Sequence, residues 1–133
     1  MAYLLDTDTF VYVMKKIQSA RKKFESYDWS ELFVASISIA ELEYGIVKSL
    51  QIEKNTKSLN GFLTLVNVIN FDITAASHYG LIRNFLEKKG TPIGSNDMLI
   101  AAIATCNDFI LVTNNEREFR RVEGLKIENW LKD

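Results

Sequence analysis

Four widely separated acidic residues, Asp6, Glu41, Asp97 and Glu118, are the side chains of this sequence best suited to chemistry. Each stands where an apolar or helical segment begins or ends, so folding can bring all four to one place. Carboxylates gathered about 5 Å apart repel one another by roughly 3 kcal/mol per pair at an effective dielectric constant near 20. Such a cluster needs a cation, and carboxylate oxygens favour Mg²⁺ or Mn²⁺. The sequence therefore predicts a divalent metal site.

Two apolar runs explain how distant acids can meet. Ala2–Leu5 ends at Asp6, and Phe109–Val112 ends at Thr113, with Glu118 just beyond. If these runs are neighbouring parallel strands, Asp6 and Thr113 lie at the carboxyl edge of the sheet, where open α/β folds bind their ligands.

Each acid also has a structural interpretation. Glu41 completes a capping box with the serine three residues earlier, in which it would satisfy backbone N–H groups at a helix start. Asp97 can be a first-turn carboxylate favoured by the helix dipole, and Glu118 stands third after the possible cap Asn115. Asp6, at the end of an apolar strand, has no such local backbone role. Single positions leave both interpretations open, whereas four placements on one sheet edge favour the metal site.

Composition limits the alternatives. The 133 residues, 47% of them hydrophobic, suffice for one domain with a core and are too few for two. Sixteen basic and seventeen acidic residues leave a net charge of −1, so any contact with nucleic acid has to be local. The single cysteine, Cys106, cannot form an intramolecular disulfide, and neither a secretory signal nor an apolar run of about eighteen residues is present. These features predict a cytoplasmic protein without a membrane span.

Strand-like and helical segments alternate along the chain, which predicts an α/β fold with a central parallel sheet flanked by helices on both faces. We expect one domain over residues 1–133. A helix over Ala75–Lys89 is expected to be capped by Thr74, and Asp97–Cys106 is apolar on nearly every side, as in an enclosed helix. The other expected helices are Thr9–Phe24, Ile39–Leu50 and Lys57–Val66, and the expected strands are Tyr3–Leu5, Leu32–Ala35, Val68–Ile69, Phe109–Val112 and Lys126–Ile127.

Other reactive side chains lack suitable neighbours. His78 is the only histidine, which leaves no material for a histidine zinc site or a Ser-His-Asp relay. Cys106 has no activating neighbour in sequence, and Asp108 precedes its strand, at the opposite end of the sheet from Asp6. The four acids therefore remain the best candidates.

Four segments resemble the four motifs of the PIN-domain ribonucleases in residue type, order and separation. The closest group is VapC, the toxin of bacterial and archaeal type II toxin–antitoxin pairs. The similarity covers essentially the whole chain, down to Trp130; each motif is weak alone, and the ordered set is specific. The segments are Leu4–Asp8, Ser38–Gly45, Pro92–Ala102 and Leu111–Phe119.

The resemblance implies roles for particular residues. Asp6, Glu41 and Asp97 correspond to the core metal-binding acids of the family, with Mg²⁺ or Mn²⁺ as the cofactor. Glu118 corresponds to the fourth acid, where aspartate is more common, and Thr113 to the polar residue that helps to hold the site.

Two positions depart from the family's pattern. Asp8 replaces the usual asparagine after the Asp-Thr pair and would add charge to the site. Glu116 is a second acid close to Glu118, and on a helical turn the two point about 200° apart. We therefore expect Glu118 to face the metal and Glu116 to face solvent.

The resemblance further implies a metal-dependent endoribonuclease toxin that cleaves phosphodiester bonds in structured RNA, such as tRNA or rRNA loops, and that a VapB-type antitoxin neutralises. A homodimer is usual in the family. Apolar positions in Thr9–Phe24 and Glu41–Leu50 can form an antitoxin groove or belong to the core. Basic residues near the site can grip the RNA backbone or be ordinary solvated surface: Arg117, Arg120, Arg121, Lys88 and Lys89.

Two alternatives stay open. Asp6-Thr7-Asp8 after an apolar run also resembles the haloacid-dehalogenase phosphatases, in which the first Asp is the nucleophile and the second the acid, although Phe10 stands where that pattern has Thr or Val. The other alternative is a non-catalytic module that binds RNA or protein. Hydrolysis of RNA, of a small phosphate ester, or of neither separates the three functions.

Overall fold

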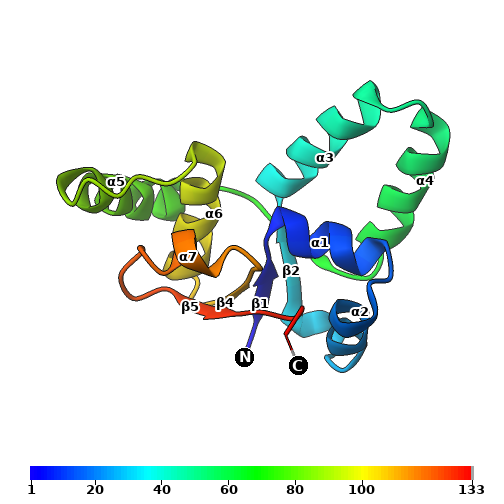
Figure 1. The fold of residues 1–133 in the computed structure, drawn as a ribbon, viewed down its shortest axis with the longest axis horizontal. Coiled ribbons are helices and arrows are strands. Elements are labelled where there is room, and N and C mark those ends of the chain that lie inside the picture. The colour runs from blue at the N-terminus through cyan, green and yellow to red at the C-terminus, as the bar shows by residue number, and fades with distance from the viewer. Residues whose placement is uncertain (133) are drawn as a thin grey trace.

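A five-stranded sheet forms the centre of the computed structural model, which describes residues 1–132. The strand order is β3-β2-β1-β4-β5, and every neighbouring pair is parallel (Figure 1). The expected α/β architecture with a parallel sheet is therefore confirmed. The strands are β1 (Tyr3–Leu5), β2 (Leu32–Ala35), β3 (Asn67–Ile69), β4 (Ile110–Val112) and β5 (Lys126–Glu128).

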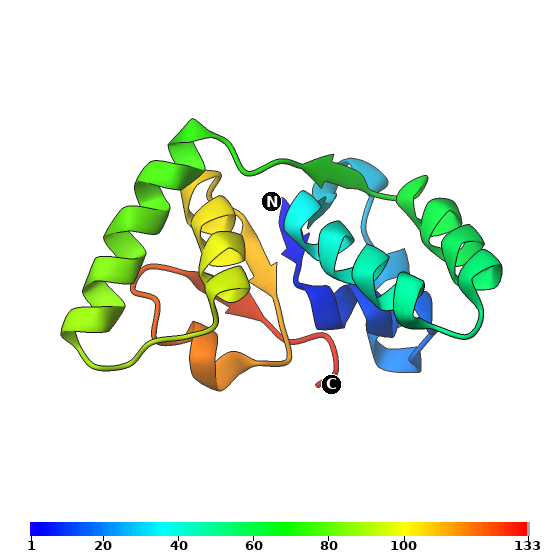
Figure 2. The same ribbon diagram turned by 90° about the horizontal axis from the view of Figure 1, so that it is seen from above.

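Helices connect these strands along the chain: α1 (Thr7–Met14), α2 (Gln18–Glu25), the 3-10 helix η1 (Trp29–Glu31), α3 (Ser36–Lys48), α4 (Ile52–Leu63), α5 (Ile73–Lys88), α6 (Ser95–Cys106) and α7 (Glu116–Phe119). α5 and α6 lie on one side of the sheet, and α1 to α4 lie on the other (Figures 1 and 2). Helices thus cover both faces, as a parallel sheet requires.

Side chains alternate along the strands and divide the interior into two apolar layers. Leu4 and Leu111 belong to the layer that packs with α5 and α6. Leu5 and Val112, the next residues along the same strands, belong to the layer that packs with α1, α2 and α4. Because β1 is buried on both faces and β4 nearly so, polar side chains that follow these two strands can reach solvent only beyond the strand ends.

α6 is the enclosed helix that the sequence predicts. Met98 and every residue from Ile100 to Ala104 are buried. The helix has 12 residues, and within residues 1–132 no helix combines the length and apolar character that crossing a membrane requires.

Two helix boundaries on the chain differ from expectation. The single helix expected over Thr9–Phe24 is divided into α1 and α2, because Lys16 adopts a left-handed conformation (φ 59°) and Ile17 is extended. Asp72, rather than Thr74, caps α5, and its carboxylate accepts a backbone N–H bond at 2.9 Å. In both cases a single backbone conformation or a competing cap decides the boundary.

The boundaries of α3 and α4 also differ. α3 begins at Ser36 instead of Ile39, so Glu41 lies inside the helix rather than at its start. α4 ends at Leu63, and Val66, which the sequence assigned to this helix, is buried in the connection to β3. Because α3 starts earlier, Glu41 is not in its first turn and cannot cap the start of this helix.

Candidate active site

Asp6 stands at the carboxyl end of β1, between that strand and α1. Its backbone N–H donates to Val112 O at 3.0 Å, which extends the pairing of β1 with β4. The residue is 5% exposed, and its Oδ1 accepts a hydrogen bond from Thr9 N at 2.9 Å as the N-cap of α1. The expectation that Asp6 has no local backbone role is therefore wrong: it caps a helix and also borders the sheet edge.

Thr113 joins Asp6 to the loop after β4. Burial raises the pKa of Asp6, and hydrogen bonding from Thr113 and Thr9 opposes that rise. Thr113 is fully buried; its backbone N–H donates to Glu128 O at 2.9 Å, and its Oγ1 accepts from Asn115 N at 2.9 Å. The ends of β1 and β4 thus meet, as the two apolar runs predict.

Glu41 projects from the interior of α3 and is half-buried. Its Oε1 accepts a hydrogen bond from Thr7 Oγ1 at 2.7 Å, and Thr7 Oγ1 lies 2.9 Å from Ser38 Oγ. The N-cap of α3 is Ala35, which has no side-chain acceptor, so the capping-box interpretation of Glu41 is wrong. The carboxylate is instead held at the start of α1 by Thr7, the residue that follows Asp6 in the sequence.

Asp97 lies in the first turn of α6 and is half-buried. Burial is the largest cause that raises its pKa to about 6, and the negative charges of Glu118, Asp6, Glu41 and Asp8 raise it further. The charges of the other three candidate acids therefore act on Asp97, and Asp8, which is exposed on α1, adds to the same field. A first-turn carboxylate also gains from the helix dipole, so this position is compatible with both the structural and the metal-binding interpretation of Asp97.

The two acids of α7 have separate partners. Glu118 Oε2 accepts a hydrogen bond from Asn115 Nδ2 at 3.0 Å. Glu116 pairs with Arg120 at 2.8 Å and with Lys132 at 2.7 Å, and hydrogen bonding from Lys132 is the largest cause that lowers the pKa of Glu116. The Glu116 side chain is only 18% exposed. The expectation that Glu116 faces solvent is therefore wrong.

Carboxylate oxygens are the donors that a hard divalent cation prefers. Among residues 1–132, however, no three His, Cys, Asp or Glu side chains come together closely enough to hold a metal ion as they stand. Repulsion between carboxylates favours separate local contacts, and a cation would offset it. The acids fit Mg²⁺ or Mn²⁺ in chemistry and in location, while their convergence requires side-chain rotation. On binding a metal ion, three hydrogen bonds would give way to contacts with the ion: those of Asp6 with Thr9, Glu41 with Thr7, and Glu118 with Asn115.

Three other reactive side chains lie outside this region, as the sequence predicts. His78 Nδ1 lies 3.4 Å from Thr105 Oγ1, between α5 and α6. Burial raises the pKa of the Cys106 thiol, which keeps it protonated and unreactive. Asp108 precedes β4, at the other end of the sheet, and pairs with Lys126 at 2.9 Å.

The basic residues expected near the site differ in how far they are exposed to solvent and held by other groups. Arg121 Nη1 donates to Pro92 O at 3.0 Å, which ties the end of α7 to the loop before α6. The other four are exposed and able to meet a phosphate backbone: Arg117, Arg120, Lys88 and Lys89.

A groove of about 400 Å³ lies between α1, α3 and α4. Its apolar lining includes Val11, Met14, Leu42, Ile46 and Leu59. Both segments expected to expose apolar positions contribute to it, and α4 supplies the third wall.

Comparison with known proteins identifies one family. The model of the PIN domain matches residues 3–125. The tRNA(fMet)-specific endonuclease VapC of Salmonella typhimurium is 40% identical to this chain over 131 residues, which cover 98% of both chains. Ribonuclease VapC2 of Rickettsia felis is 40% identical over 137 residues and also 98% of both chains.

Two solved structures share the fold over nearly the whole length. DNA-bound VapBC from Salmonella typhimurium contains a chain that is similar with a TM-score of 0.92 and 39% identity, over 98% of both chains. VapBC2 from Rickettsia felis, bound to a DNA fragment from its promoter, gives a TM-score of 0.89 and 38% identity, over 98% of this chain and 99% of that one.

Proposed function

The chain belongs to the PIN-domain family, among its VapC ribonucleases, and from that premise we propose that it is a Mg²⁺- or Mn²⁺-dependent endoribonuclease toxin acting on structured RNA. The observation that carries the metal dependence is the environment of Asp97, where burial and the charges of the other acids raise the pKa to about 6. Acids that repel one another also repel RNA, so a cation is needed for binding as well as for chemistry.

We assign the metal to Asp6, Glu41 and Asp97, with Glu118 as a fourth ligand acting through water. A divalent ion held there would supply an activated water and neutralise charge on the phosphoryl oxygens. Thr113 completes the site, because its hydrogen bond opposes the rise that burial causes in the pKa of Asp6.

Polar neighbours hold the two longer acids near the site in the metal-free protein. The Thr7 hydroxyl donates to Glu41, and the Asn115 amide donates to Glu118. A bound cation would replace these contacts, because it offsets the repulsion that favours separate local partners.

Structured RNA is the proposed substrate class because single-stranded loops expose both backbone and bases to side chains. The Salmonella typhimurium relative is named for tRNA(fMet), so a tRNA loop is the first candidate and an rRNA loop the second. Exposed cations near the acids would neutralise the phosphates of the bound strand: Arg117, Arg120, Lys88 and Lys89.

We further propose that a VapB-type antitoxin neutralises the chain, which would act as a homodimer and combine with the antitoxin in a heteromeric complex. The solved relatives are VapBC proteins, and the groove between α1, α3 and α4 offers an apolar seat for an antitoxin segment. Residues 1–133 would form one PIN domain, acting in the cytoplasm, where the Cys106 thiol stays reduced.

The test is incubation of the purified protein with total RNA, in Mn²⁺ or in EDTA, followed by sequencing of the cleavage ends. We expect cuts at a few loop positions in Mn²⁺, and none in EDTA or with Asp97→Asn. Asp108→Asn, the same acid-to-amide change at the opposite sheet edge, should cut like the wild type. Hydrolysis of a small phosphate ester instead would favour a phosphatase using Asp6 and Asp8, and absence of both activities would favour a binding module.

A further inference from the structure

The segment after β5 is anchored in the core beside the loop that carries Thr113 and Glu118. Thr113 N donates to Glu128 O at 2.9 Å, so β4 and β5 stay paired up to the site. Trp130 is 1% exposed, and its Nε1 donates to Glu128 Oε1 at 2.9 Å. The centroid of its ring lies 6.0 Å from the centroid of the Tyr3 ring on β1. This segment therefore offers the loop a fixed support.

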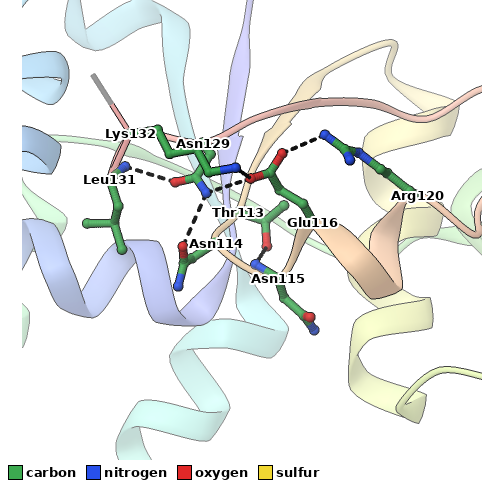
Figure 3. Close-up of polar contacts among 8 residues, drawn as sticks. All are labelled: Thr113, Asn114, Asn115, Glu116, Arg120, Asn129, Leu131 and Lys132. Carbon is green, nitrogen blue, oxygen red and sulfur yellow. Dashed lines mark hydrogen bonds and ion pairs between the residues drawn. The ribbon is translucent and has the colours of Figure 1, made fainter.

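Asn129 connects the anchored segment to the loop (Figure 3). Its Nδ2 donates to Asn114 Oδ1 at 3.1 Å and to Glu116 Oε2 at 2.9 Å. Its Oδ1 accepts from Leu131 N at 2.9 Å. An asparagine amide has two N–H donors, and both reach the same loop here. A reversed amide would set its oxygen against the Glu116 carboxylate and its nitrogen against Leu131 N–H, so these two partners assign the orientation.

The two residues that Asn129 holds lie on either side of Asn115. Asn115 N donates to Thr113 Oγ1 at 2.9 Å, and Asn115 Nδ2 donates to Glu118 Oε2 at 3.0 Å. A shift of this loop would therefore displace Thr113 and Glu118 together.

We infer that Asn129 is a positioning residue: through Asn114 and Glu116 it sets where Thr113 and Glu118 stand at the candidate metal site. The inference rests on the proposed function, because Glu118 is a proposed metal ligand. Glu116 then serves the site as the acceptor that locates the loop rather than as a ligand.

Two variants of Asn129 test this role. Asn129→Asp removes both donors and places a negative charge against Glu116. Asn129→Ser keeps an oxygen able to accept from Leu131 N, as in a serine turn, and loses only the reach to the loop. We expect both to weaken Mn²⁺ binding, measured by calorimetry, about tenfold, the low end of the effect of removing groups that orient metal ligands. RNA cleavage should fall at limiting Mn²⁺ and recover in excess Mn²⁺.

A second substitution should rescue the first. Adding Glu116→Gln to Asn129→Asp exchanges donor and acceptor, because the glutamine amide can donate to the new carboxylate. We expect the double variant to regain most of the lost Mn²⁺ affinity, and the double-mutant cycle isolates this contact. Arg120 and Lys132, the other partners of Glu116, have side chains 68% and 71% exposed, so losing these pairs should matter less.

Asp108→Asn is the matched control, because it breaks the 2.9 Å pair with Lys126 at the other end of β4 and β5 and should leave Mn²⁺ affinity unchanged. A lower melting temperature of the metal-free Asn129 variants with wild-type Mn²⁺ affinity would reveal a purely structural contact and overturn the inference. Wild-type binding and cleavage in both variants would overturn it as well, while leaving the proposed function intact. A wild-type protein that neither binds Mn²⁺ nor cleaves RNA would overturn both.

Discussion

Asp108, at the amino end of the parallel sheet, and Asp6 and Asp97, at its carboxyl end, stand in opposite environments. At the amino end, the side chain of Asp108 is 80% exposed and pairs with Lys126 at 2.9 Å. At the carboxyl end, burial raises the pKa of both Asp6 and Asp97. No ion pair within residues 1–132 includes either of these two acids. Buried acids without a cationic partner cost stability, and such a cost is concentrated where a fold performs chemistry.

This contrast has a measurable consequence. Changing Asp6 or Asp97 to its amide should lower activity and raise the stability of the metal-free protein, because the change removes a buried charge and its repulsion from neighbouring acids. The same change at the amino end should affect neither strongly, because an exposed ion pair contributes little.

The largest effect is expected from Asp6→Asn. The amide keeps an oxygen that can accept from Thr9 N but lacks the charge of a metal ligand. RNA cleavage should fall at least about a hundredfold, because even groups that only orient metal ligands contribute about 10–100-fold. Cleavage kinetics in Mn²⁺ measure the loss, with circular dichroism as the check of the fold. Cleavage of RNA at the wild-type rate would show that Asp6 is not a metal ligand.

Glu41→Gln should also abolish most cleavage while leaving the melting temperature close to that of the wild type. The glutamine oxygen can still accept the 2.7 Å hydrogen bond from Thr7 Oγ1, so the contact with α1 survives. Glu43→Gln, an exposed position on the same helix, is the control. If Glu41→Gln cleaves RNA as fast as the control, the carboxylate of Glu41 contributes only to packing and is not a metal ligand.

Glu118→Gln should have a smaller effect, since this acid is assigned to the ion through water. We expect the Mn²⁺ concentration for half-maximal cleavage to rise about tenfold. Glu116→Gln should shift it less, because the amide oxygen can still accept from Asn129. A Mn²⁺ titration of RNA cleavage by both variants gives the ranking. The reverse order would assign the role of fourth metal ligand to Glu116 instead of Glu118.

Asp97 should make the stability of the metal-free protein depend on pH. Its pKa rises from 3.8 to about 6 on folding, so the folded state binds the proton more tightly than the unfolded state. Stability should therefore fall as pH rises from about 4 to 6. At pH 7, Asp97→Asn should recover about 1 kcal/mol, a value discounted for solvent screening of a half-buried group. Urea unfolding at several pH values measures this, and an unchanged pH profile in the variant would exclude Asp97 as the source.

The smallest effect is expected from Asp108→Asn. Asn tolerates the left-handed backbone of this position, φ 55°, and the lost ion pair is exposed. The free energy of unfolding should change by less than about 0.5 kcal/mol, with cleavage unchanged. A larger loss in either measurement would mean that the two ends of the sheet are coupled.

Local sequence patterns were sufficient to predict the architecture, and they supplied the four candidate acids, whose role as metal ligands stays a prediction. Short apolar runs separated by helical periodicity predicted the parallel sheet, and β1 and β4 pair with Leu5 opposite Val112. The break between α1 and α2 was not predictable, because it depends on a left-handed Lys16 inside a segment of helical composition. The cap of α5 was missed because Asp72 and Thr74 are both good capping residues, and only one backbone geometry can be adopted.

Side-chain partners were beyond the reach of the sequence. Glu41 fits a capping box by spacing, yet it bonds Thr7, 34 residues away. Glu116 reads as a solvent-facing residue by helical period, yet Asn129, 13 residues further on, covers it. Periodicity describes which face of its own element a residue occupies, whereas contact between distant segments depends on how the elements pack. The sequence thus establishes the parallel sheet and where along the chain the acids stand, and only the packed chain establishes what each acid touches.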